Sequence, residues 1–261
     1  MSGPAENVKL GGWRPDLPDS RDLNFESLLP DLLSSMPLGV VASDEYMISS
    51  TTPISDQGKL SSCVANAVCD AFELLRGDGA QLSRLFVYWN ARRSHGDECK
   101  DEGTFVRAAF SSLGKLGVCP EEVWPYDVGN VAMRPSVLAY SSGYDHKIAG
   151  FYRIMKDGAF LDNLEVAIRA NHPVVFGTLI GKEFTEYDGS ADVIWHAPAR
   201  PIGGHAMVID GVRYIGERRD WRLRNSWSVG WGQGGCAWAS SDWLTDPTSQ
   251  DFWVATLTGS D

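Results

Sequence analysis

The stretch from Asp56 to Ala67 constrains the chain more than any other, and it reads DQGKLSSCVANA. A glycine-containing turn carries Gln57, and a serine pair offers an N-cap for the segment that follows. From Cys63 onward, apolar residues recur at i, i+3 and i+4 spacing, which predicts a buried helical stripe that ends near Gly77. Cys63 is therefore expected at a helix N-terminus, where unpaired N–H groups and the helix dipole stabilise a thiolate.

A single cysteine at a helix start is more often a small buried residue than a nucleophile. Two later motifs reverse that preference. Residues 203–209 read GGHAMVI and place His205 at the head of an apolar strand, and residues 224–232 read RNSWSVGWG and place Asn225 after another strand. Cysteine, histidine and asparagine in this order are typical of nucleophilic catalysis. The pattern thus predicts Cys63 as the nucleophile.

Composition excludes several classes of function. The chain has 261 residues, of which 43% are hydrophobic and 22% charged, as in an ordinary globular protein with a sizeable core. Its net charge of −11 argues against a nucleic-acid partner, because a phosphate-binding surface needs a basic face. No apolar run approaches the roughly 18 residues of a membrane span. Residues 1–6 lack a secretory signal pattern, which predicts a cytoplasmic protein or export by a non-classical route.

The five cysteines are an odd number, so at least one is unpaired within the chain. Beside Cys63, we interpret Cys69 as a core thiol, while Cys99 and Cys119 could pair, a question that spacing alone leaves open. There is no C-x-x-C pair and no cluster with metal-ligand spacing, so no metal site is predicted. The remaining histidines are interpreted as structural; they are His95, His146, His172 and His196.

The order of the expected elements indicates an α+β protein with two lobes. A leader, residues 1–37, is rich in turn formers and holds a short amphipathic helix at 25–33 that Pro30 interrupts. It is either an arm packed on the domain or a pro-segment that covers a cleft. Helices are predicted at 82–93, with Ser83 as cap, at 104–116, ended by Gly117, and at 160–170. Strands are predicted at 173–180, 205–214, 221–225, 235–239 and 252–257, and residues 128–145 are expected to connect the lobes.

With Gln57, Cys63, His205 and Asn225 identified, the chain resembles the papain-like cysteine proteases. The resembling segments are 57–65, 203–209 and 224–232. His205 lies 142 positions after Cys63, within the roughly 130–150 typical of the family, and Asn225 lies slightly beyond that range. The resemblance implies a papain-like two-lobe fold, with a mainly helical lobe at 38–127, a mainly β lobe at 128–261 that is an antiparallel sheet or barrel-like, and the active-site cleft between them.

The resemblance also implies the chemistry of the site. Cys63 would attack a peptide carbonyl and form a thioester acyl-enzyme, with His205 as general acid and base. Asn225 would orient the imidazole, and Gln57 would donate to the oxyanion. The chain would then be a cysteine endopeptidase and a monomer that acts on peptides or proteins without a cofactor.

The substrate-binding residues that the resemblance implies surround these four. Gly103 would pair its backbone with the substrate main chain. Gly177 and Ala206 would line the pocket for the second residue before the cut. Trp227 would shield the bond between the catalytic histidine and asparagine, and Trp231 would form a wall on the primed side.

The chain also departs from the family pattern. Leu60 replaces a cysteine that usually forms a disulfide, Val64 replaces a tryptophan beside the nucleophile, and only about 37 residues precede the domain, in place of a long inhibitory pro-region. This combination resembles a short-leader, bacterial type of zymogen. An acyl transferase or a deamidase could use the same triad, since fold does not dictate function. A non-catalytic binding module is a third alternative, against which the intact motifs argue.

Overall fold

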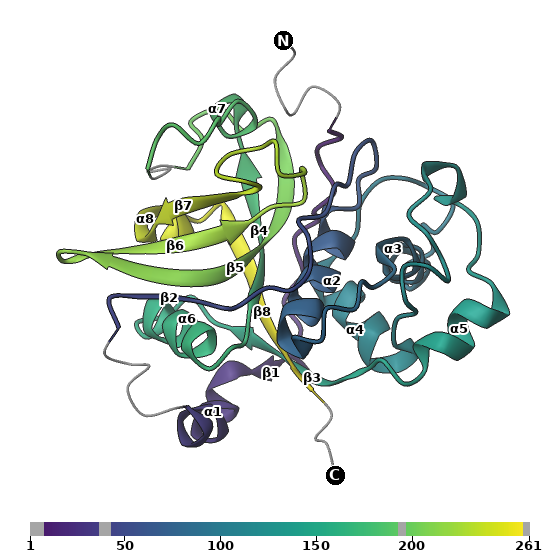
Figure 1. Ribbon diagram of the computed structural model, residues 1–261, viewed down its shortest axis with the longest axis horizontal. Helices are drawn as coiled ribbons and strands as arrows, with labels where there is room; N and C mark the ends of the chain where they lie inside the picture. Colours follow the sequence, from purple (N-terminus) through teal and green to yellow (C-terminus); the bar gives the residue numbers. More distant parts are fainter. Residues whose placement is uncertain (1–7, 37–42, 193–196, 258–261) are drawn as a thin grey trace.

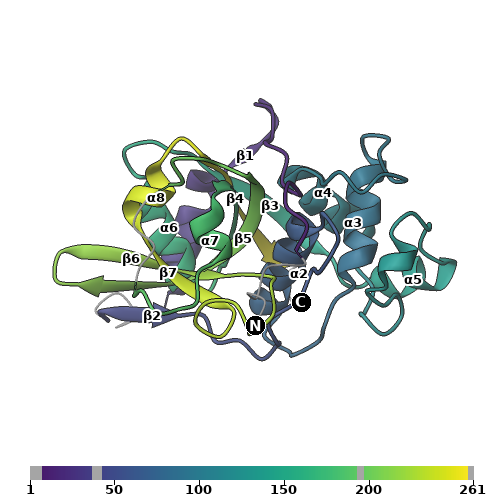
Figure 2. The same cartoon turned by 90° about the horizontal axis from the view of Figure 1, so that it is seen from above.

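The computed structural model describes residues 8–36, 43–192 and 197–257. Two groups of elements lie side by side (Figure 1). One holds the helices α2 (Cys63–Arg76), α3 (Arg84–Arg93), α4 (Val106–Leu116) and α5 (Val137–Gly143), and the other holds the sheet with α6 (Phe160–Arg169), α7 (Lys182–Thr185) and α8 (Ser241–Thr245). Seen from above, α2 stands between the sheet and α3 (Figure 2), while α4 contacts the sheet directly. The expected α+β architecture is confirmed.

The predicted helices form, with local differences at their ends. α2 ends at Gly77, whose left-handed conformation (φ 65°) a glycine adopts without strain. The serine pair does not cap it as expected, because the Ser62 hydroxyl contacts the Tyr126 hydroxyl instead. In α3, by contrast, the Ser83 hydroxyl accepts the Phe86 N–H at 3.2 Å, as predicted. α4 begins two residues later than expected and stops before Gly117.

The sheet has eight strands among the described residues. They are β1 (Leu23–Asn24), β2 (Glu45–Met47), β3 (Ile148–Ile154), β4 (Val174–Ile180), β5 (Gly203–Ile215), β6 (Arg218–Arg224), β7 (Cys236–Ser240) and β8 (Ser249–Leu257). The order is β1-β3-β8-β4-β5-β6-β7, with β2 on β5, and all pairs are antiparallel except β1 with β3. The sheet is open, so the barrel-like alternative is not what forms. β3 was not predicted, and the expected connection at 128–145 contains α5 and a 3-10 turn at Val128–Asn130.

The leader contributes to both the sheet and the core. β1 extends the sheet beside β3, and a 3-10 turn (Phe25–Ser27) leads into α1 (Leu29–Ser35). Pro30 lies in the first turn of α1, where its missing N–H costs nothing, so it starts this helix and does not interrupt it as predicted. Phe25 is fully buried, and Leu28 and Leu32 are nearly so. The predicted boundary at residue 37 lies outside the described residues.

A buried ion pair joins the two groups of elements beside the site. Asp70 of α2 accepts from Arg224 Nε of β6 at 3.1 Å, and both side chains are buried. Arg224 also donates to the carbonyls of Thr52 and Pro53. Because Arg224 directly precedes Asn225, this pair fixes the end of β6 against the helix that begins with Cys63.

All five cysteines carry free thiols. Cys69 is buried, as expected of a core thiol. Cys99 is exposed and Cys119 is buried, so the pairing left open by their spacing does not form. No helix within the described ranges is long and apolar enough to span a membrane.

Candidate active site

Cys63 is the first residue of α2, and its side chain is fully buried. Burial raises the pKa of the Cys63 thiol to about 12, although backbone N–H groups of Ala206, Val64 and Gly12 oppose this increase. A thiolate is favoured by such donors and disfavoured by an apolar cover. In this conformation the cover prevails, and the thiol keeps its proton at neutral pH.

His205 and Asn225 meet at 2.7 Å, between imidazole Nε2 and amide Oδ1. The same Oδ1 accepts the Ser226 N–H at 2.8 Å, which fixes the orientation of the amide. Nε2 must therefore carry the proton, so Nδ1 is the unprotonated nitrogen of the neutral imidazole. Burial lowers the pKa of His205 to about 4. The Trp227 ring lies 4.7 Å from the imidazole, centroid to centroid, and is itself buried; its role as a shield stays a prediction.

Gln57 is held by contacts at both ends of its amide. Its Oε1 accepts the Ser226 hydroxyl at 2.8 Å, and its Nε2 donates to Leu60 O at 3.1 Å and to Lys9 O at 3.3 Å. The second of these carbonyls belongs to the leader. An amide N–H of Gln57 is thus directed at a carbonyl from outside the catalytic lobes, as an oxyanion donor would be.

A cleft segment of the leader, residues 9–14, lies over Cys63. Gly12 can approach the thiol because it has no side chain: a Cβ there would lie 2.7 Å from Cys63 Sγ. The backbone of Thr104 accepts from Arg14 N–H and donates to Gly12 O, each at 3.0 Å. On the other side, Gly11 N–H donates to Gly204 O at 3.0 Å. The cleft segment is therefore paired through its main chain on both sides.

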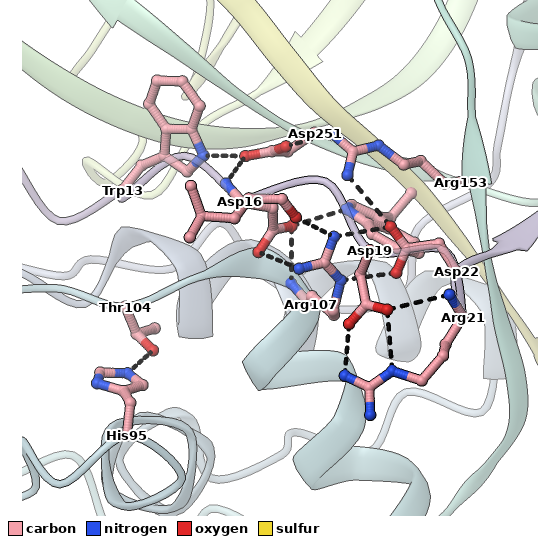
Figure 3. Close-up of polar contacts among 12 residues, drawn as sticks. Trp13, Asp16, Asp19, Arg21, Asp22, His95, Thr104, Arg107, Arg153 and Asp251 are labelled. Atoms are coloured by element: carbon pink, nitrogen blue, oxygen red, sulfur yellow. Dashed lines mark hydrogen bonds and ion pairs between the residues drawn. The ribbon is translucent and has the colours of Figure 1, made fainter.

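The predicted main-chain partner, Gly103, does not make these bonds; Thr104 makes them. Gly103 has a φ of 79°, and a Cβ on it would lie 2.3 Å from Gly12 O. Because it has no side chain, Gly103 allows the leader backbone to come close, and its left-handed conformation places Thr104 where it can pair with the leader. His95 supports the same loop, because its Nε2 lies 3.1 Å from the Thr104 hydroxyl (Figure 3).

Trp13 fills a pocket beside the thiol. A Cβ on Gly177 of β4 would lie 2.0 Å from the indole, so the pocket exists because this residue is glycine. Gly204 of β5 lies against the same indole, because a Cβ there would lie 3.0 Å from ring atom Cε3. The indole N–H donates to Asp251 Oδ2 at 3.0 Å. Ala206 lies opposite Gly177 in the β4–β5 register, and its part in the pocket stays a prediction.

Trp231 is fully buried. Its indole N–H donates to Phe184 O at 2.9 Å, and its ring packs edge-on against Trp227 at 5.7 Å. It supports the residue that shields His205, and its contact with substrate stays a prediction.

The other histidines make ordinary contacts where the structure describes them. His146 and His172 bond to the carbonyls of Val118 and Ala170, and His196 lies outside the described residues. Within the described ranges, no group of three His, Cys, Asp or Glu could hold a metal ion. The sequence reasoning missed Thr104 and Asp251. Only the Gly-Gly-Trp run at 11–13 could have suggested a segment able to enter a narrow cleft.

These features define a class of protein: a cysteine-type peptidase of papain-like fold. A family model described as "Papain family cysteine protease" matches residues 43–243. The match covers well over half of the sequence, so the chain belongs to the papain family of cysteine proteases.

Individual relatives agree with this assignment. An uncharacterized peptidase C1-like protein of Acanthamoeba polyphaga mimivirus is 30% identical over 76% of this chain and 68% of its own length. Ananain of Ananas comosus is 26% identical over 78% of this chain, which spans only 55% of ananain. Among solved structures, xylellain, a cysteine protease from Xylella fastidiosa, aligns with a TM-score of 0.79 at 28% identity, covering 97% of this chain and 98% of xylellain. The expected resemblance to a bacterial papain-like protease is confirmed.

Proposed function

We propose that the chain is a cysteine endopeptidase whose nucleophile is Cys63 and whose own leader keeps it closed. The observation that carries the proposal is the catalytic geometry: Cys63 begins α2, and His205 is fixed by a 2.7 Å bond to Asn225. The family assignment supports peptidase chemistry at this site.

The steps follow from the proton positions. Nδ1 of His205 takes the Cys63 proton, and the resulting thiolate attacks the carbonyl carbon of the scissile bond. The imidazolium then gives the proton to the leaving amine as the C–N bond breaks, which leaves a thioester on Cys63. Water then attacks the thioester carbonyl while His205 takes its proton. The C–S bond breaks, the acyl group leaves as a carboxylic acid, and the imidazolium returns the proton to the sulfur of Cys63. Asn225 keeps Nε2 protonated throughout and so leaves Nδ1 available.

The negative charge that develops on the carbonyl oxygen needs donors that are already in place. Gln57 is suited to this role because Ser226 and Leu60 hold its amide, and it carries one further N–H that now meets Lys9 O. The backbone N–H of Cys63 is the second donor. Loss of one such donor costs on the order of 10²–10³ in rate.

The cleft segment stands where a substrate must bind. It pairs through Gly11, Gly12 and Arg14 with both walls, and it places Gly12 against the thiol. Burial raises the pKa of Cys63 to about 12 and lowers that of His205 to about 4. At neutral pH both side chains are therefore uncharged, and the reactive thiolate does not form. When the cleft segment leaves, water and substrate replace the apolar cover, and the thiolate–imidazolium pair becomes accessible.

An acidic latch, Asp16 and Asp22, holds the leader further along the chain (Figure 3). Asp22 accepts from Arg107 of α4 at 2.7 Å and lies 3.3 Å from Arg153 of β3. Asp16 accepts the backbone N–H of Arg107 at 3.2 Å. The latch thus ties the leader to a helix and a strand that come together only in the folded protein.

The leader is not a separable unit over its whole length. A chain beginning at Gly39 would lose β1 and the buried Phe25 as well as the cleft segment. Such a truncation would change both the stability of the fold and the access to Cys63, so its activity could not be assigned to either effect. A substitution at Trp13 removes the anchor of the cleft segment and leaves Phe25 in place.

The test uses the full-length Trp13→Ala variant, a mixture of unstructured peptides, and mass spectrometry of the products. The proposal predicts new amino termini inside the peptides, and their disappearance when Cys63 is also replaced by Ala. Ammonia release, or transfer of an acyl group to an added amine without hydrolysis, would assign the triad to a deamidase or an acyl transferase instead.

A further inference from the structure

The pocket that holds Trp13 is shaped for a flat ring. Gly177 and Gly204 meet the indole from β4 and β5, and neither leaves room for a side chain of its own. Trp13 is 4% exposed, and it directly follows Gly12, which covers Cys63. A substrate side chain entering this pocket therefore lies one residue from the reacting carbon.

A carboxylate lies at the inner end of the pocket. Asp251 of β8 is 2% exposed, and its Oδ2 accepts the Trp13 indole N–H at 3.0 Å and the Asp16 backbone N–H at 2.8 Å. Its Oδ1 accepts from Arg153 at 2.8 Å. Figure 3 shows the indole N–H and Arg153 meeting Asp251 from two sides. In the part of the chain that the structure describes, the hydrogen bonds to this carboxylate thus come from the leader and from Arg153.

The backbone is distorted where it presents this carboxylate. β4 and β8 change register between Val175, opposite Trp253, and Gly177, opposite Gln250, so β8 bulges at Asp251. Asp251 also has a φ of 56°, in the left-handed region. Bulges re-aim side chains next to active sites, and strained residues persist where the surrounding structure over-determines them. The distortion directs the Asp251 side chain toward the pocket that holds the indole, which points to a role in binding there.

Departure of the leader changes the polar environment of the pocket. Asp251 Oδ2 loses both of its donors, Trp13 and Asp16, while Oδ1 keeps Arg153. Asp22 directly precedes β1, so it keeps its contacts with Arg107 and Arg153. The open pocket then holds an unfilled acceptor on a buried carboxylate, with two guanidinium groups nearby.

We propose that Asp251 is a specificity-determining residue that selects tryptophan as the substrate residue in this pocket. The proposal rests on the proposed peptidase function. A buried acceptor without a donor is costly, so a phenyl ring, which fills the slot but donates nothing, is bound less well. Lysine or arginine could donate, but either would have to lose its hydration to enter a slot in which Asp251 is already paired with Arg153. A neutral indole meets both requirements.

The experiment uses the full-length Trp13→Ala variant and peptides that differ only at the second residue before the scissile bond. That residue is tryptophan, benzothienylalanine (the same ring shape with sulfur in place of N–H), phenylalanine or lysine. We expect kcat/KM for tryptophan to exceed each of the others by about tenfold or more. An equal rate for the tryptophan and benzothienylalanine peptides would overturn the proposal.

Two further variants tie the effect to the carboxylate. Asp251→Gly removes the acceptor and accepts a φ of 56° without strain, so it should reduce the tenfold preference to about twofold or less. Asp251→Asn keeps an acceptor oxygen and tolerates the same backbone, so it should retain part of the preference. A preference that persists unchanged in Asp251→Gly would contradict the assignment.

A binding measurement separates this inference from the proposed function. Synthetic peptides of residues 8–22, with tryptophan or benzothienylalanine at position 13, are used to protect Cys63 of the Trp13→Ala protein from iodoacetamide. The indole peptide should protect at a concentration about tenfold lower, whether or not any substrate is cleaved. Equal protection overturns the inference alone, and absence of cleavage with unequal protection overturns only the peptidase proposal.

Discussion

Replacing Trp13 by alanine should open the site, and the size of the effect can be worked out from its contacts. The indole is 4% exposed and bonds to a buried carboxylate at 3.0 Å. Truncation of a buried tryptophan to alanine typically costs about 3–5 kcal/mol, with the lost bond to a charged group included in that range. Since 1.4 kcal/mol is a factor of ten, the open fraction should rise by at least about 100-fold, until the open form predominates.

The second-order rate of Cys63 alkylation by iodoacetamide measures this opening without requiring catalysis. The matched control is Leu17→Ala, because Leu17 lies in the same leader and is 77% exposed, so its rate should equal that of the parent. Circular dichroism and the urea midpoint confirm that the fold is retained. If Trp13→Ala is alkylated no faster than the parent, the cleft segment does not control access to the thiol.

Three further outcomes are expected. Asn225→Ala should lower kcat about tenfold in the opened protein, the worth of one buried hydrogen bond, and added imidazole should not restore it. Asp70→Ala removes the ion-pair partner of the buried Arg224, so urea unfolding should show a loss of about 3–5 kcal/mol. Burial and the nearby Asp251 charge raise the pKa of Asp16 from 3.8 to about 7 in the closed form. The closed form is therefore most stable, relative to the open form, below pH 3.8, and it loses stability as the pH rises to about 7. The alkylation rate of the parent, divided by that of Asp16→Asn, should rise between pH 5 and 7 and then level off. A ratio that falls as the pH rises would contradict the sign of that shift.

Local sequence signals predicted the elements that carry the catalytic residues. α2 could be predicted because the signals that define it, the spacing of its apolar residues and the glycine at 77, lie within the segment or directly after it. The Ser83 cap of α3 is a local signal of the same kind. Pro30 shows the ambiguity of a single residue: the same ring that breaks a helix interior is favoured in its first turn, and only the position of the helix start decides between them.

The parts that were missed depend on contacts far apart in the chain. Trp13 and Asp251 are separated by 238 positions, and the bulge that turns Asp251 toward the indole arises from the register between β4 and β8. Thr104 was assigned to a helix because its neighbours fit the period, whereas it pairs with a leader segment 90 residues earlier. Periodicity describes one segment at a time and carries no information on such partners.

The central claim is that Cys63 hydrolyses peptide bonds once the leader is displaced. The most direct test is to incubate full-length Trp13→Ala with a tryptophan-containing peptide in water enriched in ¹⁸O and to determine the product masses. The account predicts internal cleavage, one ¹⁸O in each new carboxylate from hydrolysis of the thioester, and no cleavage when Cys63 is replaced by alanine. Cleavage that survives the loss of Cys63, or an opened protein whose thiol is readily alkylated but which hydrolyses nothing, would contradict it.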